Sequence, residues 1–498
     1  MSSPGPNGRE EPPRIRQCQC VSRELRYEGA LRSKCSLPRG DNRASVRLNL
    51  LGVSYGTISG WSSAALPTLQ EPHDESPLRA YGPISQPQAS WIGGMLCVGG
   101  VLGTFVGGAI VERIGRKWTA WVAGWPLIAC WMLVIVADHP YYLMGARFLG
   151  GLGGGIEFVV TPLFVSEIAC TRHRGTLSSM LMLSCYVGVE LAYLYGAFLP
   201  YHTIAWVSVI MPLVFLATFG FLPESPTHLA KVQNMPAAER SLRFYRGIRT
   251  EKDALAEEEY GRELQLLHGM QETLPEKQPI RLTWSDFTGR HARQAFLICL
   301  TLMALNQFCG CFYMMNYAQS VFAESGSGLP ASLSVIVVGL IQLLGCYVCT
   351  LLVDRTGRKI LLIVSSAGMA LGLAVFASYC YGQVLGYDLT TLGWLPLLCF
   401  SFVVFIGSLG VGTIPFVMLA EIMPQKIKGF ATTFCMGTNW AFAFVSLKYF
   451  SSIGILFGMH GILTFFAVCS LTGALFVLVV MPETKGKSFH EIQQMMEK

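Results

Sequence analysis

The sequence contains the stretch Glu112-Arg113-Ile114-Gly115-Arg116-Lys117 and, later, the stretch Asp354-Arg355-Thr356-Gly357-Arg358-Lys359. Both have the order acid, Arg, variable residue, Gly, Arg, Lys. Each directly follows a long apolar run, the second and the eighth of twelve such runs. A helix needs about 20 apolar residues to cross a bilayer core of roughly 30 Å. The repeat at equivalent places therefore predicts two related halves of six membrane helices each.

The composition supports a chain that lies mostly in lipid. Hydrophobic residues make up 52% and charged residues 14%, whereas an average soluble chain has roughly 25% charged residues. Because lipid cannot satisfy backbone polar groups, we expect each run to be a helix, which predicts an all-α membrane protein. The predicted spans are 48–69, 89–111, 118–137, 142–165, 176–199, 203–222, 294–322, 330–353, 360–381, 394–419, 430–452 and 458–481.

The polar segments divide the chain further. Residues 1–46 have no apolar periodicity and are predicted to be a disordered tail. Between the six-helix bundles 47–223 and 293–482 lies the polar linker 224–292, in which Ala237 to Tyr245 and Asp253 to Leu267 have helical character. Residues 483–498 form a polar C-terminal tail.

The basic residues predict the orientation of the chain. All of the 37 Lys and Arg except Arg79, Arg147 and Lys448 fall in the two tails, the linker or alternate loops. Basic loops are retained on the cytoplasmic side, so we expect both termini and the linker to be cytoplasmic. The formal charge of +6 then reflects topology, and no nucleic-acid partner is expected.

The charged turns also suggest a switch. Gly115 and Gly357 can adopt the backbone conformation of a tight turn. A second repeat places Glu167 seven residues before Arg174, and Glu421 seven residues before Lys428. We expect an ion-pair network that holds the cytoplasmic ends together in one state and separates in another; the alternative is that the turns only anchor the topology. The predicted members are Arg113, Arg116, Glu167, Arg174, Glu224, Asp354, Arg355, Arg358, Glu421 and Glu483.

Several further motifs carry a resemblance that runs from about residue 48 to the end. They are Arg147-Phe148-Leu149-Gly150-Gly151-Leu152-Gly153, Pro162, Pro223-Glu224-Ser225-Pro226, Asn306-Gln307-Phe308-Cys309-Gly310, Pro415, Asn439-Trp440 and Pro482-Glu483-Thr484-Lys485-Gly486. In order and spacing, together with the charged turns, they resemble the sugar porters of the major facilitator superfamily, in particular insect facilitated trehalose and glucose transporter-like proteins. The resemblance implies the major facilitator fold, alternating access between two six-helix halves, and a carbohydrate substrate.

The resemblance also implies a sugar site between the halves. Gln307 matches the second glutamine of the family's span seven and Asn439 the asparagine of span eleven, while Asn306 and Gln342 occupy other polar positions. Amides suit sugar hydroxyls because they donate and accept hydrogen bonds. Aromatic faces pack on sugar rings. The predicted substrate-binding residues are Asn306, Gln307, Gln342, Asn439, Trp440, Phe416 and Tyr317; the alternatives are amides bonded to neighbouring helices and aromatics that only pack.

The sequence departs from the family at other polar positions. Met182, Phe312, Ser408 and Ala443 stand where a glucose site has amides or a carboxylate, so the predicted pocket is less polar. Gly410, Gly412 and Pro415 interrupt span ten and predict a bend there.

Coupling is inferred from span one. Proton-coupled relatives have an aspartate where this chain has Ser54, which favours facilitated diffusion of a hexose or trehalose. Glu157 and Glu190 are the exceptions, because a carboxylate inside a span is a functional candidate. The alternatives are a proton-coupled symporter and a sugar sensor that does not transport. No enzyme motif, metal site or cofactor is expected, and we expect a monomer in the plasma membrane.

Overall fold

The computed structural model gives the arrangement of most of the chain. The residues that it describes are 39–71, 78, 81–169, 174–248, 254–273, 286–287, 289–325, 329–424, 427–485 and 495. Most of the predicted N-terminal tail and of the C-terminal tail lie outside these residues.

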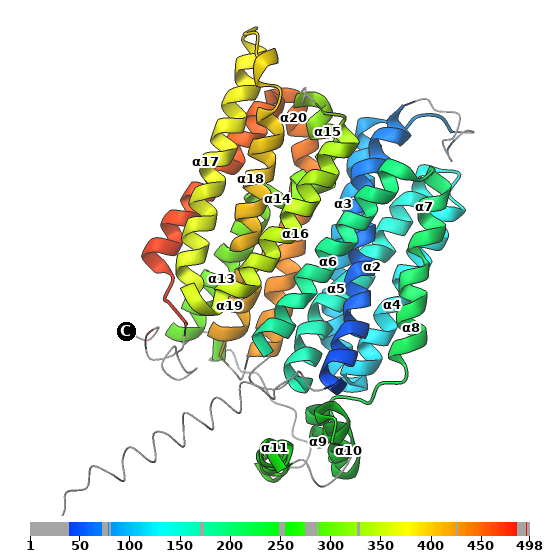
Figure 1. Cartoon of the computed structure of the whole chain (residues 1–498), viewed down its shortest axis with the longest axis vertical. Coiled ribbons are helices and arrows are strands. Elements are labelled where there is room, and N and C mark those ends of the chain that lie inside the picture. The colour runs from blue at the N-terminus through cyan, green and yellow to red at the C-terminus, as the bar shows by residue number, and fades with distance from the viewer. Residues whose placement is uncertain are drawn as a thin grey trace, which may run out of the picture.

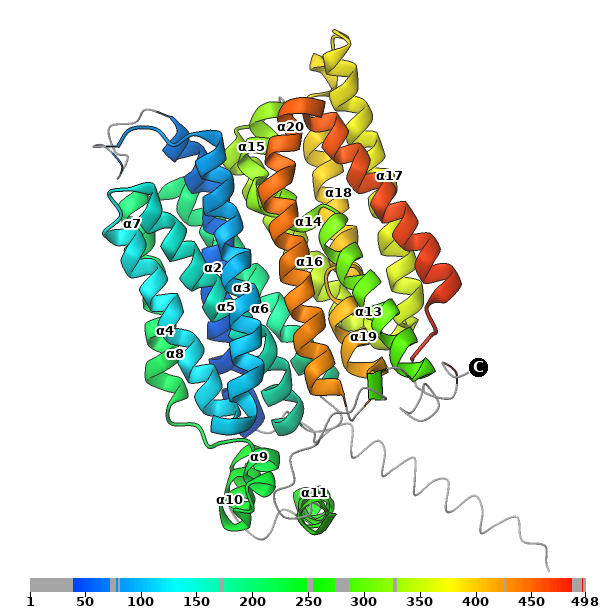
Figure 2. The same ribbon diagram turned by 180° about the vertical axis from the view of Figure 1, so that it is seen from behind.

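The described residues form helices in two bundles that stand side by side (Figures 1 and 2). The N-half contains α2 (Arg39–Gln70), α3 (Gln86–Ile114), α4 (Arg116–Ile135), α5 (Pro140–Ile168), α6 (Arg174–Phe198), α7 (Tyr201–Ser208) and α8 (Ile210–Phe219). The C-half contains α13 (Arg290–Phe308), α14 (Cys311–Asn316), α15 (Ala318–Ser325), α16 (Ala331–Thr356), α17 (Arg358–Val384), the short 3-10 helix η1 (Thr390–Leu392), α18 (Leu395–Leu409), α19 (Ile414–Ile422) and α20 (Lys428–Val480).

Three short helices lie between the halves in sequence. They are α9 (Pro226–Lys231), α10 (Met235–Arg246) and α11 (Ala254–Thr273), and all three sit beyond one end of the bundles. We call this the linker end, and the opposite end the far end. Helix α10 covers the first stretch of the linker in which the sequence predicts helix, and α11 covers the second from Ala254 on.

Not every predicted span is apolar enough to be recognised by composition. Ten helical segments of the described chain are long and apolar enough to cross a membrane. The two other predicted spans are α2, which already begins at Arg39 inside the expected tail, and the first part of α20, which continues past a kink at Gly458 (φ +68°) into the last span. Helix α2 has buried Ser54, Thr57 and Ser62, so its polar side chains face protein.

Span ten is broken, as its Gly and Pro residues predict. Helix α18 ends at Leu409 and α19 begins at Ile414. A break inside a membrane leaves backbone groups that lipid cannot satisfy. Here Ser365 of α17 donates to the carbonyl of Ile406 at 2.7 Å and accepts from the N–H of Val411 at 3.1 Å, which satisfies the break from a neighbouring helix.

Glycines allow helices of the N-half to pack backbone against backbone. A Cβ added at Gly99 of α3 would lie 1.9 Å from the carbonyl oxygen of Phe148 in α5, and one at Gly151 of α5 would lie 1.8 Å from that of Leu96 in α3. Small residues at such positions let membrane helices approach closely. This contact fixes α3 against α5.

The two charged turns have the same backbone geometry. Gly115 and Gly357 both have φ +94°, a conformation that residues with a Cβ rarely adopt. An added Cβ would also lie 2.4 Å from the carboxylate of Glu224 at the first turn and 2.7 Å from that of Glu483 at the second. The predicted need for glycine at these turns is confirmed.

We expect the Gly357→Ala substitution to lower the free energy of unfolding by about 1–3 kcal/mol, because it strains the backbone and displaces Glu483. The measurement is thermal unfolding in detergent micelles. Gly429→Ala is the control, since an added Cβ there meets nothing within 4 Å. Equal melting temperatures for the two variants would contradict this explanation.

Candidate functional site

Three of the predicted amides form one cluster in the C-half. Gln307 Nε2 donates to Asn306 Oδ1 and to Asn439 Oδ1, both at 3.1 Å. Asn306 Nδ2 donates at 2.7 Å to the carbonyl of Val411 in the break of span ten. Gln307 is 4% exposed and Asn439 7%. The cluster therefore joins α13, α20 and the break between α18 and α19.

The cluster has unused hydrogen-bonding capacity. Gln307 Oε1 is buried and has no hydrogen-bond partner among the described residues. A buried acceptor without a donor costs about 1–3 kcal/mol. A ligand hydroxyl that donates to this oxygen would recover that free energy.

Two of the aromatic candidates, Trp440 and Phe416, lie at the interface between the halves, and Trp440 directly follows Asn439 in α20. The ring of Trp440 lies 6.0 Å from that of Tyr55 and 5.8 Å from that of Phe158, both from the N-half. The ring of Phe416 lies 6.3 Å from that of Phe158. Trp440 also packs on Gly100 of α3, where an added Cβ would lie 2.5 Å from the indole. These rings form an aromatic contact that joins the halves through Phe158.

The other two predicted site residues make separate contacts. Gln342 of α16 donates from Nε2 to the sulfur of Met315 at 3.0 Å. Tyr317 donates to the carbonyl of Leu447 at 3.2 Å and lies against Gly93 of α3. Tyr317 thus belongs to the contacts between the halves near the far end.

Hydrogen bonds in which at most one partner is charged cross between the halves near the far end. Asn316 of α14 accepts from Ser62 at 3.0 Å and from Arg147 Nη2 at 3.4 Å. Tyr193 of α6 donates to the carbonyl of Met315 at 2.8 Å, and Lys448 of α20 donates to Ser90 of α3 at 2.8 Å. These bonds close the far end in this conformation.

Sequence reasoning did not select these residues as a site. Arg147 and Lys448 did stand out as basic residues away from the basic loops. A basic residue within a span needs partners, and this signal could have placed them at an interface. Nothing in the sequence indicated Asn316 as their partner.

At the linker end the charged turn of the N-half is held within that half. Arg116 is fully buried and pairs with Glu112 at 2.8 Å and with Glu167 at 3.0 Å. Glu224 accepts hydrogen bonds from the backbone N–H groups of Arg116 and Lys117 at 3.0 and 2.9 Å. Glu224 therefore caps the first turn of α4, where carboxylates are stabilised by the helix dipole.

The C-half repeats the arrangement. Arg358 pairs with Glu421 at 3.1 Å, and Glu483 accepts from the backbone N–H groups of Arg358 and Lys359 at 3.1 and 3.0 Å. Glu483 thus caps α17 as Glu224 caps α4. We refer to these two interactions as the Glu224 cap and the Glu483 cap.

The described ion pairs of both charged turns join residues of the same half. The predicted network that holds the cytoplasmic ends together in one state and separates in another therefore stays a prediction. Arg113 and Arg355 are exposed. The side chains of Arg174 and Asp354 lie outside the described residues. Glu224 and Glu483 were expected to form ion pairs, and they bind backbone N–H groups instead.

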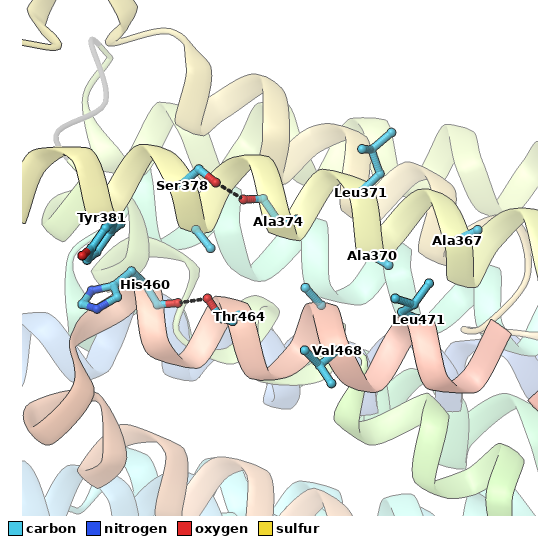
Figure 3. Close-up of a pocket in the computed structure, with 12 residues that line it drawn as sticks. Ala367, Ala370, Leu371, Ala374, Ser378, Tyr381, His460, Thr464, Val468 and Leu471 are labelled. Carbon is cyan, nitrogen blue, oxygen red and sulfur yellow. Dashed lines mark hydrogen bonds between the residues drawn. The ribbon is translucent and has the colours of Figure 1, made fainter. Parts of the chain in front are cut away.

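A cavity of about 650 Å³ lies elsewhere, between α17 and the last part of α20. Alanines such as Ala370 and Ala374 line it, with Tyr381 and His460 at one end (Figure 3). Figure 2 shows α17 and this part of α20 on the side of the C-half away from the N-half. None of the predicted sugar-site residues lines it, so we do not assign it as the site.

Comparison with known proteins decides the family. Residues 45–496 match the family described as "Sugar (and other) transporter". The chain belongs to this transporter family. It is similar to the facilitated trehalose transporter Tret1 of Bombyx mori, with 32% identity over 459 residues that cover 90% of this chain and 85% of the relative. It is also similar to Tret1 of Polypedilum vanderplanki, with 31% identity over 455 residues, 91% of this chain and 87% of the relative.

Solved structures of transporters share the fold. The proton:xylose symporter XylE, a major facilitator superfamily protein bound to 6-bromo-6-deoxy-D-glucose, superimposes with a TM-score of 0.73 at 21% identity, covering 93% of this chain and 100% of that one. A partially occluded inward-open conformation of XylE from E. coli gives 0.70 at 20% identity, covering 90% and 100%. The predicted major facilitator fold is confirmed for this member of the transporter family.

We expect the Glu483 cap of this transporter to be sensitive to pH. Burial raises the pKa of the Glu483 carboxyl. Hydrogen bonds from backbone N–H groups, among them those of Lys485, Arg358 and Lys359, lower this pKa by more than burial raises it, so the pKa lies below its ordinary value of 4.5. A carboxyl whose pKa is depressed in the folded state contributes stability above its unfolded pKa and loses it as pH falls through the folded pKa.

We therefore expect Glu483→Gln to lower the free energy of unfolding by ~1 kcal/mol at pH 7, and the difference from the wild type to shrink toward pH 4 and below. Thermal unfolding at a series of pH values measures it. Glu71→Gln, at an exposed position after α2, is the control. A difference that stays constant down to pH 3 would show that the carboxylate charge is not what stabilises the turn.

Proposed function

We propose that this member of the sugar transporter family carries a hexose or trehalose across the membrane by facilitated diffusion. The observation that carries the proposal is the amide cluster of Asn306, Gln307 and Asn439. Gln307 and Asn439 are buried, Trp440 at the interface of the halves directly follows Asn439, and Gln307 Oε1 has no donor among the described residues. Uncharged amides bind hydroxyls and release them without a counter-ion. The relatives named as facilitated trehalose transporters support the same substrate class.

The proposed mechanism is alternating access. The far end is closed by hydrogen bonds that cross between the halves, while the described ion pairs of the linker end stay within each half. Rocking one half against the other would break the far-end bonds and open the amide cluster to that side. From the distribution of basic residues we propose that the linker end is cytoplasmic. The proposed membrane is the plasma membrane, and the proposed functional unit is a monomer.

Facilitated diffusion is supported by span one. Ser54 stands where proton-coupled relatives have an aspartate, and its hydroxyl donates to the carbonyl of Leu50 at 2.7 Å. A serine cannot carry a proton at physiological pH. The competing hypothesis of a proton symporter draws on the fold shared with XylE, which is a proton:xylose symporter.

The test is uptake of labelled glucose and trehalose into proteoliposomes without ion gradients. We expect saturable uptake that a protonophore leaves unchanged. Uptake that requires an inward proton gradient would replace uniport by symport, and saturable binding without flux would indicate a sensor.

Within the same assay, Gln307→Ala is expected to lower Vmax/KM about tenfold, the effect of removing one or two hydrogen bonds to the substrate. Thr301→Ala is the control, because Thr301 lies on the same helix, is half-buried, and among the described residues bonds only to the carbonyl of Leu297 within its own helix. Equal uptake by both variants would remove Gln307 from the substrate site.

A further inference from the structure

The second carboxyl that the sequence places inside a span, Glu190, lies at the interface between the halves. It is on α6 of the N-half and is 5% exposed. It points at Gly339 of α16 in the C-half, where an added Cβ would lie 1.8 Å from Glu190 Oε2. The carboxyl thus occupies the space that the missing side chain of Gly339 leaves on the opposite half.

Both helices place this contact at the same depth. Glu190 lies eight residues before the end of α6 at Phe198, and Gly339 eight residues after the start of α16 at Ala331. At 1.5 Å per residue this is about 12 Å from the far end. The contact is therefore part of the closed far end, beside the bond from Tyr193 to Met315.

Neither oxygen of Glu190 has a hydrogen-bond partner among the described residues. Tyr193 is the titratable group that faces it from its own helix, and the hydroxyl of Tyr193 is bonded to Met315. On α16 it faces Gly339 and, one turn deeper, the uncharged Gln342. Arg147 of α5 is bonded to the carbonyls of Ile58 and Ile92 and to Asn316.

This environment tolerates a neutral carboxyl far better than an ion. Burying a carboxylate without a partner is so unfavourable that such a group takes up a proton instead. Opening of the far end would part α6 from α16 and expose Glu190 to the solution on that side, where water stabilises the ion. The far end therefore cannot close while the Glu190 carboxyl is ionised.

We propose that Glu190 is a proton-binding site reached from the extracellular side, and that a proton must bind there before the far end can close. The proton returns to the same side when the far end reopens, since the carboxyl stays buried while that end is closed. Sugar uniport then proceeds without net proton transfer, but its rate depends on external pH. This inference rests on the proposed function for its orientation and for the sugar flux.

The chain supplies a matched control in Glu157. It is also fully buried, and neither of its oxygens has a partner among the described residues. It lies inside the N-half, where an added Cβ at Gly52 of α2 would be 3.2 Å from its Oε1 and where Ser184 of α6 is also close to Gly52. Rocking of the halves leaves these N-half neighbours together, so Glu157 should not be exposed by opening.

The experiment measures sugar uptake into proteoliposomes at a fixed internal pH of 7 while the external pH is varied. We expect uptake by the wild type to fall at least fivefold between pH 5.5 and pH 8, because above its pKa the protonated fraction of a carboxyl falls about tenfold per pH unit. Glu190→Gln should keep the acid rate throughout, and Glu157→Gln should follow the wild type. A trapped pH dye should record no sugar-dependent proton entry.

A wild-type rate that is flat with external pH, or a Glu190→Gln profile that matches the wild type, would overturn the proposal. Sugar-dependent proton entry would also overturn it, because the proton would then cross. Should Glu190→Gln not fold, Glu190→Asp keeps a titratable group and should keep the pH dependence; loss of the dependence in this variant counts against the site.

A readout without sugar separates this proposal from the proposed function. Hydrogen exchange of the far-end parts of α6 and α16 in nanodiscs should be slower at pH 5.5 than at pH 8, after correction for the intrinsic rate, and this difference should vanish in Glu190→Gln. If flux is absent but the difference is present, transport is wrong and the proton site stands. If the difference is absent in the wild type, the proton site is wrong whatever the flux shows.

Discussion

Hydrocarbon offers no hydrogen-bond partner, and this constraint shapes every polar position in the bundles. The broken backbone of span ten is satisfied by Ser365 on one side and Asn306 on the other. Some polar side chains of α2, α6, α14 and α20, namely Ser62, Tyr193, Asn316 and Lys448, bond across the surface that the halves share. A surface of this kind is held by contacts that protein can form and water can replace, which is what a carrier that opens on either side needs.

Polar contacts within a half and polar contacts between the halves use different kinds of groups. Within each half, charges meet backbone N–H groups or opposite charges at the Glu224 cap and the Glu483 cap. Such charge-assisted bonds are roughly twice as strong as neutral ones. Between the halves the structure uses amides, hydroxyls and aromatic edges, with Arg147 and Lys448 as cationic donors. A neutral bond contributes only about 0.5–1.5 kcal/mol, so the neutral bonds of the shared surface can be exchanged for bonds to water while each half keeps its form.

Most of the architecture could be predicted from the sequence, because the period and length of apolar runs are local properties of the chain. The charged turns with Gly115 and Gly357, the break near Pro415 and the helices of the linker were all readable in this way. The amide cluster was reached through resemblance, and its geometry agrees with a shared site, although its role in binding is a prediction. Contacts between residues distant in sequence could not be predicted. Examples are the bonds of Glu224 to backbone N–H groups of α4, the hydrogen bond from Arg147 to Asn316, and the contact of Glu190 with Gly339. These depend on how helices are rotated and paired, which no single segment encodes.

The two caps have a consequence for the integrity of the chain. Glu224 follows the sixth span and Glu483 the twelfth, and each returns to the turn between the second and third spans of its own bundle. In each bundle the residue after the last span is thereby bonded to a turn of the same bundle, and neither bond involves the other bundle. A cut in the polypeptide between α10 and α11 would leave both the Glu224 cap and the Glu483 cap intact. The two fragments could then be made as separate chains and still associate as complementary subunits.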